Sequence, residues 1–374
     1  MKNILVFSAG ERGRDLVNQY IEFGGKSRIA AIVDNCPMME CYRGIEVVLP
    51  ERIGQFEFDE IWVCTIYYPQ IRKQLIEEFG ISSTKIIYVD PVMPLIDERI
   101  RNRYEKLLKR GVRSDNGELI EVLEYIADKP ARMYCYPFYD EYIHKDAPVF
   151  YDEDKRLFYV MHSSKKMYFS RKFDTEQKAR CYYNAIAMEQ DERSPHCYWN
   201  DEGVRKSING VVVDVGAAEG IFALDAIDSA EHIYMFEVEE DWIEALQCTF
   251  EPYVDKVTII RKFVSDYDDE EHCRLDTVFK NCKMNCIKMD IEGVEMQALK
   301  GAENILKEQE PVLAVCVYHH QDDNQIISEW LQKQGFSVSN SKGYVLCQGE
   351  WELDKDEADF RRALIFGKKE QEHA

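Results

Sequence analysis

The stretch at residues 211–220, VVVDVGAAEG, constrains the fold of this chain more than any other. An apolar run passes through an acid at Asp214, the backbone turns at Gly216, and an apolar-periodic helix starts after Gly220. Glycines allow a tight turn and a close approach to a ligand, and the first turn of a helix offers free N–H groups. A second apolar run ends at Glu237. The pattern predicts the strand–turn–helix–strand unit of a nucleotide-type fold.

Two carboxylates in the turn, Asp214 and Glu219, decide which ligand the unit suits. Pyrophosphate binds bare backbone donors at a helix N-terminus, and nearby anions repel it. The two acids favour a ligand with an ammonium and a sulfonium, and Glu237 suits the two hydroxyls of a ribose. The loop therefore predicts S-adenosylmethionine as the cofactor. The alternative is an ordinary strand–turn–helix with two solvated acids.

Charge and composition restrict the partners and the compartment. A formal net charge of −22 would repel phosphodiester backbones, so nucleic acid is excluded as the expected partner. An apolar content of 45% supports packed cores. No stretch approaches the roughly 18 apolar residues that span a bilayer, and the N-terminus has the pattern of a strand rather than of a signal peptide. Twelve cysteines without Cys-x-x-Cys pairs indicate a reduced, cytoplasmic protein.

Residues 1–92 alternate strands with helices, which predicts a small, Rossmann-like, doubly wound domain. Asp34 lies near the ribose-carboxylate spacing from Gly13, but Ser8 stands where the first glycine of such a loop would be. This segment resembles the small domains that bind nucleotides or sugar nucleotides in bacterial sugar-modifying enzymes. The alternative is a scaffold or a homodimerisation domain without a ligand.

Three further parts complete the expected organisation. Residues 93–130 predict a helical linker, and residues 131–204 form an aromatic-rich segment with a hairpin around Ser163-Ser164. Its aromatic side chains either stack on the faces of a sugar or pack a small core. Residues 205–374 predict an α/β domain with the strand arrangement of class I methyltransferases, closed by an antiparallel pair at 343–347 and 362–366.

A set of motifs in the C-terminal part resembles the FkbM-type methyltransferases. The motifs are DVGAAEG at 214–220, Phe236-Glu237, Leu275-Asp-Thr277, IKMDIEG at 287–293 and ALKGA at 298–302. The last two are the most specific. The resemblance is strong over roughly 205–340 and looser over about 148–200. It implies an S-adenosylmethionine-dependent O-methyltransferase, often acting on saccharides or other secondary metabolites.

The resemblance also implies roles for individual residues. The methionine part of the cofactor would be held by Asp214, Gly216, Ala217, Glu219 and Gly220. Glu237 would bind the ribose hydroxyls, and Ser265 and Asp266 would contact adenine after the third strand. Asp290 would end the fourth strand next to the methyl group. The alternative for Asp266 is a plain surface turn.

Transfer of a methyl group to a hydroxyl requires a base that takes the hydroxyl proton. Candidates at the carboxyl ends of strands are Asp290, Glu292, His319 and His320, with His319 preferred. His196, on a polar loop before the domain, is a further candidate. Alternatively, one histidine of the pair caps the following helix or faces solvent. The expected site holds no metal, although a variant with Mg²⁺ on the two acids and a histidine stays open.

These features together predict an enzyme that methylates a hydroxyl of a small molecule, a sugar or a sugar nucleotide. Two alternatives remain. One is a methyltransferase-fold protein without activity that serves in binding or assembly, favoured by the incomplete glycine pattern around Ser8. The other is a methyltransferase of a non-sugar metabolite, whose N-terminal domain is only a scaffold.

Overall fold

The fold is taken from a computed structural model, which describes residues 2–22, 28–89, 99–105, 116–143, 145–347 and 359–369. Contacts between the described residues divide the chain into two compact units. Unit 1 comprises the described residues up to Asp146, together with Asp359. Unit 2 comprises those of 147–347 and 360–369. The division into four parts expected from the sequence stays a prediction.

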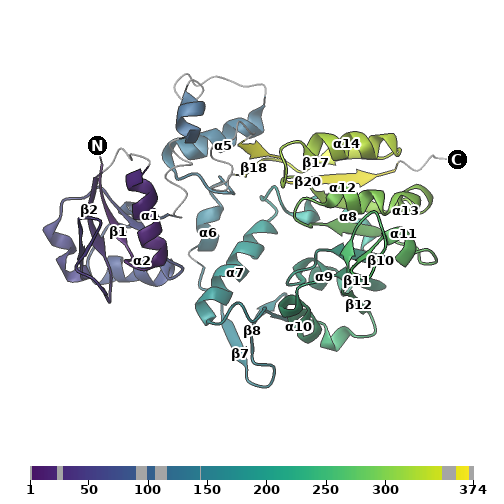
Figure 1. Cartoon of the computed structure of the whole chain (residues 1–374), viewed down its shortest axis with the longest axis horizontal. Coiled ribbons are helices and arrows are strands. Elements are labelled where there is room, and N and C mark those ends of the chain that lie inside the picture. Colours follow the sequence, from purple (N-terminus) through teal and green to yellow (C-terminus); the bar gives the residue numbers. More distant parts are fainter. Residues whose placement is uncertain are drawn as a thin grey trace. The chain divides into compact units, whose positions relative to one another are not determined.

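Unit 1, which begins with the purple strands labelled β1 and β2 in Figure 1, is built around a six-stranded sheet in the order β3-β4-β2-β1-β5-β6. Its strands are β1 (Asn3–Phe7), β2 (Arg28–Val33), β3 (Cys41–Tyr42), β4 (Ile45–Val48), β5 (Glu60–Val63) and β6 (Ile86–Tyr88). Its helices are α1 (Glu11–Glu22), α2 (Tyr68–Glu77), α5 (Gly117–Asp128) and α6 (Tyr139–Ile143). All its strand pairs except β3 with β4 are parallel, as the alternation of strands and helices predicts.

The loop after β1 is bound by the side chain of Asp34, which follows β2. Both oxygens of Asp34 accept hydrogen bonds from main-chain N–H groups, one from Ala9 at 2.6 Å and one from Cys36 at 2.9 Å. A side chain at Gly13 would lie 1.9 Å from the carbonyl oxygen of Ser8, so only glycine fits there. The carboxylate at the expected ribose position therefore already organises the loop.

Unit 2 contains a seven-stranded sheet in the order β12-β11-β10-β15-β16-β20-β17. Its strands are β10 (Val211–Val215), β11 (His232–Phe236), β12 (Val257–Ile260), β15 (Cys286–Met289), β16 (Val312–Cys316), β17 (Ser337–Asn340) and β20 (Leu364–Lys368). The first five are parallel to one another, and β20 runs antiparallel between β16 and β17. The expected class I methyltransferase architecture is confirmed.

The C-terminal strand pair expected from the sequence is wrong in its pairing. Residues 364–368 pair with Ser337–Asn340 inside the main sheet, and not with 343–347. The short strands β18 (Val345–Leu346) and β19 (Phe360–Arg361) pair with each other instead. The partner strand Ser-Val-Ser-Asn has no apolar pattern that predicts a strand, because three of its four residues are polar.

The helices of unit 2 pack on its sheets, and those from residue 275 onward share one hydrophobic core with the seven-stranded sheet. The helices are α7 (Glu176–Glu189), α8 (Glu202–Ser207), α9 (Ile221–Ala226), α10 (Glu240–Thr249), α11 (Leu275–Val278), α12 (Glu295–Lys300), α13 (Glu303–Glu308) and α14 (Asp323–Lys333). Helices α12 and α13 are separated at Gly301, where a side chain would lie 1.9 Å from the carbonyl oxygen of Ser265. No helix among the described residues is long and apolar enough to cross a membrane.

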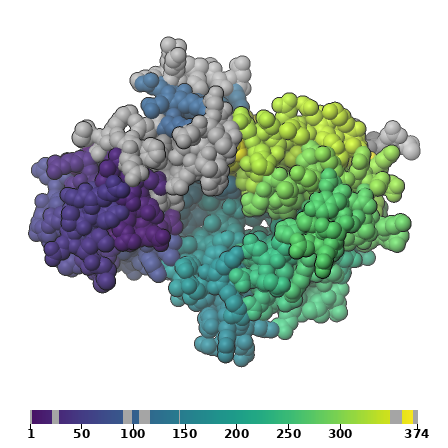
Figure 2. All heavy atoms as spheres, viewed as in Figure 1, coloured from purple at the N-terminus to yellow at the C-terminus, as the bar shows by residue number. Residues whose placement is uncertain are grey.

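A second, three-stranded sheet begins unit 2, formed by β7 (Val149–Asp152), β8 (Leu157–His162) and β9 (Lys165–Tyr168). The expected hairpin at Ser163-Ser164 is confirmed, and both serines have positive φ, 47° and 68°. The β7–β8 end of this sheet, teal in the space-filling view, projects at the lower edge of Figure 2. Unit 2 also contains the short strands β13 (Phe263–Val264) and β14 (His272–Cys273) and the short helix η3 (Tyr198–Asn200).

Candidate active site

A cavity of about 710 Å³ opens at the carboxyl ends of β10, β11 and β15. This is the edge at which ligands bind in open α/β sheets, and the volume is in the range of small-molecule sites. The lining combines four acids, aromatic rings and main chain: Val215, Gly216, Ala218, Phe236, Glu237, Val238, Glu239, Trp242, Lys262, Phe263, Val264, Ser265, Tyr267, His272, Asp290, Ile291, Glu292, Val294 and Gln297.

Five of the residues predicted from the sequence line this cavity: Gly216, Glu237, Ser265, Asp290 and Glu292. The structure therefore brings together residues from four separate segments of the chain. The others do not contribute to the lining, and these are Asp214, Ala217, Glu219, Gly220, Asp266, His319 and His320. Their expected roles stay predictions, and their surroundings differ from one another.

Glu237 follows β11 and is held in one orientation by three main-chain N–H groups. One carboxylate oxygen accepts from Ala218 at 2.9 Å, and the other accepts from Val238 at 2.7 Å and Glu239 at 2.9 Å. The side chain is 8% exposed. A carboxylate with several fixed donors keeps lone pairs for further hydrogen bonds while its position is set. The three donors fix the position of Glu237 and leave about one of the four lone-pair sites of its carboxylate for a hydroxyl in the cavity.

The loop between β10 and α9 adopts the backbone that its glycines permit. Gly216 has φ +79°, and a side chain there would lie 1.9 Å from the carbonyl oxygen of Asp290. Gly220 has φ +81°, and a side chain there would meet Leu246 at 2.7 Å. Both positions require glycine, since an added Cβ is strained by φ and blocked by neighbouring atoms. The loop can therefore pass close to β15 and leave main chain facing the cavity.

Asp214 is fully buried behind this loop rather than in the cavity. Its carboxylate forms an ion pair with Lys288 of β15, with 3.0 Å between the nearest nitrogen and oxygen. Lys288 also donates a hydrogen bond to the carbonyl oxygen of Gly216 at 2.6 Å. Burial opposes the charge of Lys288, but Asp214 and Asp290 outweigh it and raise the pKa of Lys288. Through these two contacts, Lys288 links Asp214 to the turn at Gly216.

Glu219 is also buried, at 6% exposure, and accepts a hydrogen bond of 2.6 Å from the Tyr182 hydroxyl of α7. Burial raises the pKa of Glu219 above its ordinary value. The aromatic segment before the domain therefore closes over the acidic loop. The rings of Tyr182, Phe173 and Trp242 stack on one another within this contact, with centroids 4.4–5.7 Å apart.

The opposite end of the cavity has an aromatic wall. The ring of His272 stacks on Phe263 with centroids 5.3 Å apart, and Tyr267 lies 4.7 Å from His272. Ser265 lies beside this wall and is buried, whereas Asp266 is exposed and outside the lining. Flat rings of this kind suit a heteroaromatic base. The wall was missed in the sequence because its members are separated by a run of acids.

Asp290 is the centre of a polar network under the cavity floor. The Tyr198 hydroxyl donates a hydrogen bond of 2.9 Å to Asp290, and His196 lies 3.7 Å from the same oxygen. Burial opposes ionisation of Asp290, but Lys288, His196 and His319 lower its pKa below the ordinary value. Asp290 is therefore a carboxylate with one face in the cavity and the other among buried donors.

His319 lies among three carboxylates. Its Nδ1 is 3.0 Å from Glu295, and its Nε2 is 3.6 Å from Asp290 and 3.7 Å from Glu292. Burial lowers the pKa of His319, but the Glu295 hydrogen bond and the neighbouring charges raise it on balance. His320 is exposed, and its main-chain N–H donates to Asp323 at 2.8 Å. Between the two histidines, only His319 reaches Asp290.

Several residues of the site were not singled out in the sequence: Tyr182, Lys288, Glu295, Tyr198 and Cys316. Lys288 and Glu295 stand within or next to the IKMDIEG motif, so their position was available as a signal. Tyr198 and Cys316 carried none, because one follows a polar loop and the other ends an apolar strand. Their role depends on tertiary contacts alone.

Two segments of the chain match models of known protein families. A family model described as C2185-like, N-terminal, matches residues 1–87, and the methyltransferase FkbM domain model matches residues 249–338. Comparison with curated proteins finds no match. Among solved structures, a methyltransferase FkbM from Methylobacillus flagellatus KT is 17% identical, with 98% of this chain and 90% of that chain covered and a TM-score of 0.47.

Two further solved structures align with a smaller part of the chain. A putative methyltransferase from Streptococcus mutans in complex with SAH is 15% identical, covers 45% of this chain and 98% of its own, and has a TM-score of 0.30. A SAM-dependent O-methyltransferase from Thermotoga maritima is 15% identical, with 44% and 61% covered and a TM-score of 0.30. The family model confirms the resemblance seen in the motifs: the segment 249–338 belongs to the methyltransferase FkbM domain family.

Proposed function

We propose that this chain is an S-adenosylmethionine-dependent methyltransferase that transfers a methyl group to a hydroxyl of a small molecule, a sugar or a sugar nucleotide. The observation that carries the proposal is the cavity at the carboxyl ends of the strands, with preorganised Glu237 in its wall and aromatic rings at one end. A cavity of about 710 Å³ is large enough for the cofactor and part of an acceptor.

The residues present fit the cofactor in three places. Glu237 would accept from the ribose hydroxyls, and Phe263, Tyr267 and His272 would contact the adenine ring. The main chain at Gly216 and Ala218 would face the methionine part. Asp214 and Glu219 would act from behind the loop, because both are buried outside the lining. Asp214 is then a residue that positions the loop rather than one that touches the cofactor.

The cofactor, when bound, supplies a methyl group already activated by a sulfonium, and the protein's contribution is positioning and proton removal. Asp290 and Glu292 line the cavity after β15 and would orient the acceptor hydroxyl. His319, within 3.7 Å of both acids, would receive the hydroxyl proton through them. Holding the two reactants in line supplies a large part of the acceleration of such a step.

The proposal extends to the cellular compartment of the protein, which we infer from its cysteines. All twelve cysteines lie in described segments, and none of them is in a disulfide. Cysteines outside disulfides are typical of a reducing environment. We therefore place the protein in the cytoplasm, where sugar nucleotides and S-adenosylmethionine are both available as small molecules.

The first test is calorimetric titration of the full chain with S-adenosylmethionine and S-adenosylhomocysteine. Glu237→Gln keeps the shape of the side chain but removes its charge and one acceptor, so we expect the affinity to fall at least about tenfold, or 1.4 kcal/mol. Glu240→Gln is the matched control, because Glu240 is exposed on α10 and does not line the cavity.

Equal affinity in the intact chain and Glu237→Gln would reject this assignment of the cofactor site. The acceptor is tested separately with methyl-labelled cofactor and a panel of sugar nucleotides. Label transfer to a sugar hydroxyl supports the full proposal. Tight cofactor binding without transfer to any member of the panel would favour the alternative of a binding or assembly protein.

A further inference from the structure

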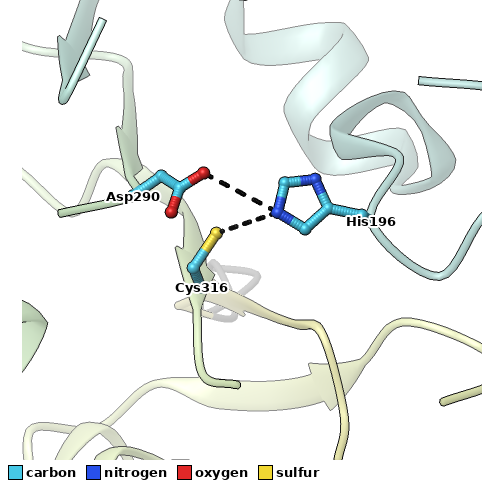
Figure 3. A group of neighbouring side chains, drawn as sticks. All are labelled: His196, Asp290 and Cys316. Atoms are coloured by element: carbon cyan, nitrogen blue, oxygen red, sulfur yellow. Dashed lines mark hydrogen bonds and ion pairs between the residues drawn. The ribbon is translucent and has the colours of Figure 1, made fainter. Parts of the chain in front are cut away.

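Three side chains from separate segments converge beside the candidate active site (Figure 3). His196 comes from the loop before η3, Asp290 follows β15, and Cys316 ends β16. The Nε2 atom of His196 lies 3.5 Å from the Cys316 sulfur and 3.7 Å from an Asp290 oxygen. One potential ligand atom from each residue lies within 4.8 Å of the other two.

These separations match those of ligands around one tetrahedral ion. Zinc binds sulfur at about 2.3 Å, histidine nitrogen at about 2.0–2.1 Å and carboxylate oxygen at about 2.0–2.2 Å. With tetrahedral angles, such bonds place the ligand atoms about 3.3–3.6 Å apart. The observed 3.5 Å and 3.7 Å from His196 Nε2 are close to these values. The Tyr198 hydroxyl, 2.9 Å from Asp290 and 3.7 Å from the Cys316 sulfur, would turn aside from a bound ion.

The donor types of the group also favour a cation. They are an imidazole nitrogen, a carboxylate oxygen and a sulfur, and the side chains of His196 and Cys316 are buried. An ion that binds the sulfur displaces the thiol proton, which passes to solvent. The loaded set would carry two negative charges, which a divalent ion neutralises.

A neighbouring group of acids and a histidine is a poorer candidate for the same ion. One ion could also be bound by Asp290, Glu295 and His319, whose ligand atoms lie within 4.8 Å of one another. However, both ring nitrogens of His319 already face carboxylates, Nδ1 at 3.0 Å from Glu295 and Nε2 at 3.6 Å from Asp290. This group has no sulfur and would suit a harder ion. Sulfur, imidazole and carboxylate together favour zinc.

We propose that His196, Asp290 and Cys316 form a binding site for one divalent ion of the zinc class. Asp290 also lines the cavity, so the ion would lie beside the place where an acceptor hydroxyl binds. A bound metal lowers the pKa of a hydroxyl that it contacts. This role in methyl transfer rests on the proposed function, whereas binding of the ion does not.

The test uses the full chain in a Cys36→Ser/Cys41→Ser background, which removes the two exposed cysteines. Metal-free protein is titrated with Co²⁺, whose thiolate complexes have a charge-transfer absorption, and zinc content is measured by mass spectrometry after reconstitution. We expect one ion per chain and a cobalt–thiolate band. Cys316→Ser should abolish the band and weaken binding at least about tenfold, and His196→Gln should weaken binding similarly.

Two controls make the assignment specific. Cys286→Ser removes another fully buried thiol, on the neighbouring strand β15, and should leave the band unchanged. His319→Gln removes the histidine of the second group and should also leave it unchanged. Absence of stoichiometric binding, or a band that survives both Cys316→Ser and His196→Gln, would overturn the proposal. Calorimetry with S-adenosylmethionine on metal-free protein separates failure of this site from failure of the proposed function.

Discussion

At the scale of single residues, the buried Asp214–Lys288 pair is the strongest electrostatic feature of unit 2. Asp214 is 0% exposed and Lys288 4% exposed. Asp214→Ala would leave the Lys288 ammonium buried without its carboxylate, and we expect the free energy of unfolding to fall by about 3–5 kcal/mol. Denaturation in urea measures the loss. Asp214→Ala should therefore lower the stability of the fold as well as affect ligand binding.

The double variant Asp214→Ala/Lys288→Met is the control for that explanation. It removes the stranded charge, so it should recover part of the stability lost in the single variant. Glu202→Ala breaks an exposed ion pair with Lys206 and should change stability little. A double variant no more stable than the single one would show that the effect does not arise from an unpaired lysine.

At the scale of elements, the hairpin at β8–β9 gives a prediction from its turn. Ser163 and Ser164 have φ of 47° and 68°, the pattern of a type I′ turn, in which Asn-Gly is preferred. Ser163→Asn/Ser164→Gly should relieve backbone strain and raise the free energy of unfolding by about 0.5–1 kcal/mol. Thermal unfolding checks this, and Lys155→Asn in the neighbouring turn is the control. A loss of stability would show that the serine side chains stabilise the turn.

The same hairpin shows which elements a sequence can predict. Alternating apolar residues flank Ser163-Ser164, so the pairing is local and visible. The parallel strands were visible for a similar reason, since each is an apolar run that ends in a polar residue. The pairing of β17 with β20 was missed because these strands are joined by more than twenty residues and β17 is mostly polar. Distant pairing leaves no periodic signal.

The residues of the candidate site also fall into two groups, those that the sequence predicts and those that only the folded chain brings together. Gly216, Glu237 and Asp290 were predictable, since each lies at a strand end in a motif of known spacing. His196 and Cys316 are 120 residues apart and meet only in the folded chain. Asp214 was expected to touch the cofactor, and its burial behind the loop depends on Lys288, whose direction a sequence does not fix. Spacing locates the edge of a site but not the side chains beneath it.

At the scale of the whole molecule, the two units contain two α/β sheets, each with a loop that follows its first strand and leads into a helix. In unit 2 this loop borders the cavity, and the carboxylate after the second strand, Glu237, lines it. In unit 1 the corresponding carboxylate, Asp34, accepts from the main chain of Ala9 and Cys36, much as Glu237 accepts from its neighbours. The cavity, rather than the bonding of the carboxylate, therefore leads us to expect the cofactor in unit 2.

Hydrogen exchange on the full chain tests this assignment. With S-adenosylmethionine at 100 times its dissociation constant, ligand binding stabilises the unit that contains the site by about 2.7 kcal/mol. We expect amides of β10, β11 and β15 to exchange up to about a hundredfold more slowly, and those of β1, β2 and β5 to remain unchanged. Glu237→Gln at the same concentration should show weaker protection. Slower exchange in β1 and β2 would mean that the loop near Asp34 also binds the cofactor, and that its hydrogen-bonded carboxylate opens to receive a ribose.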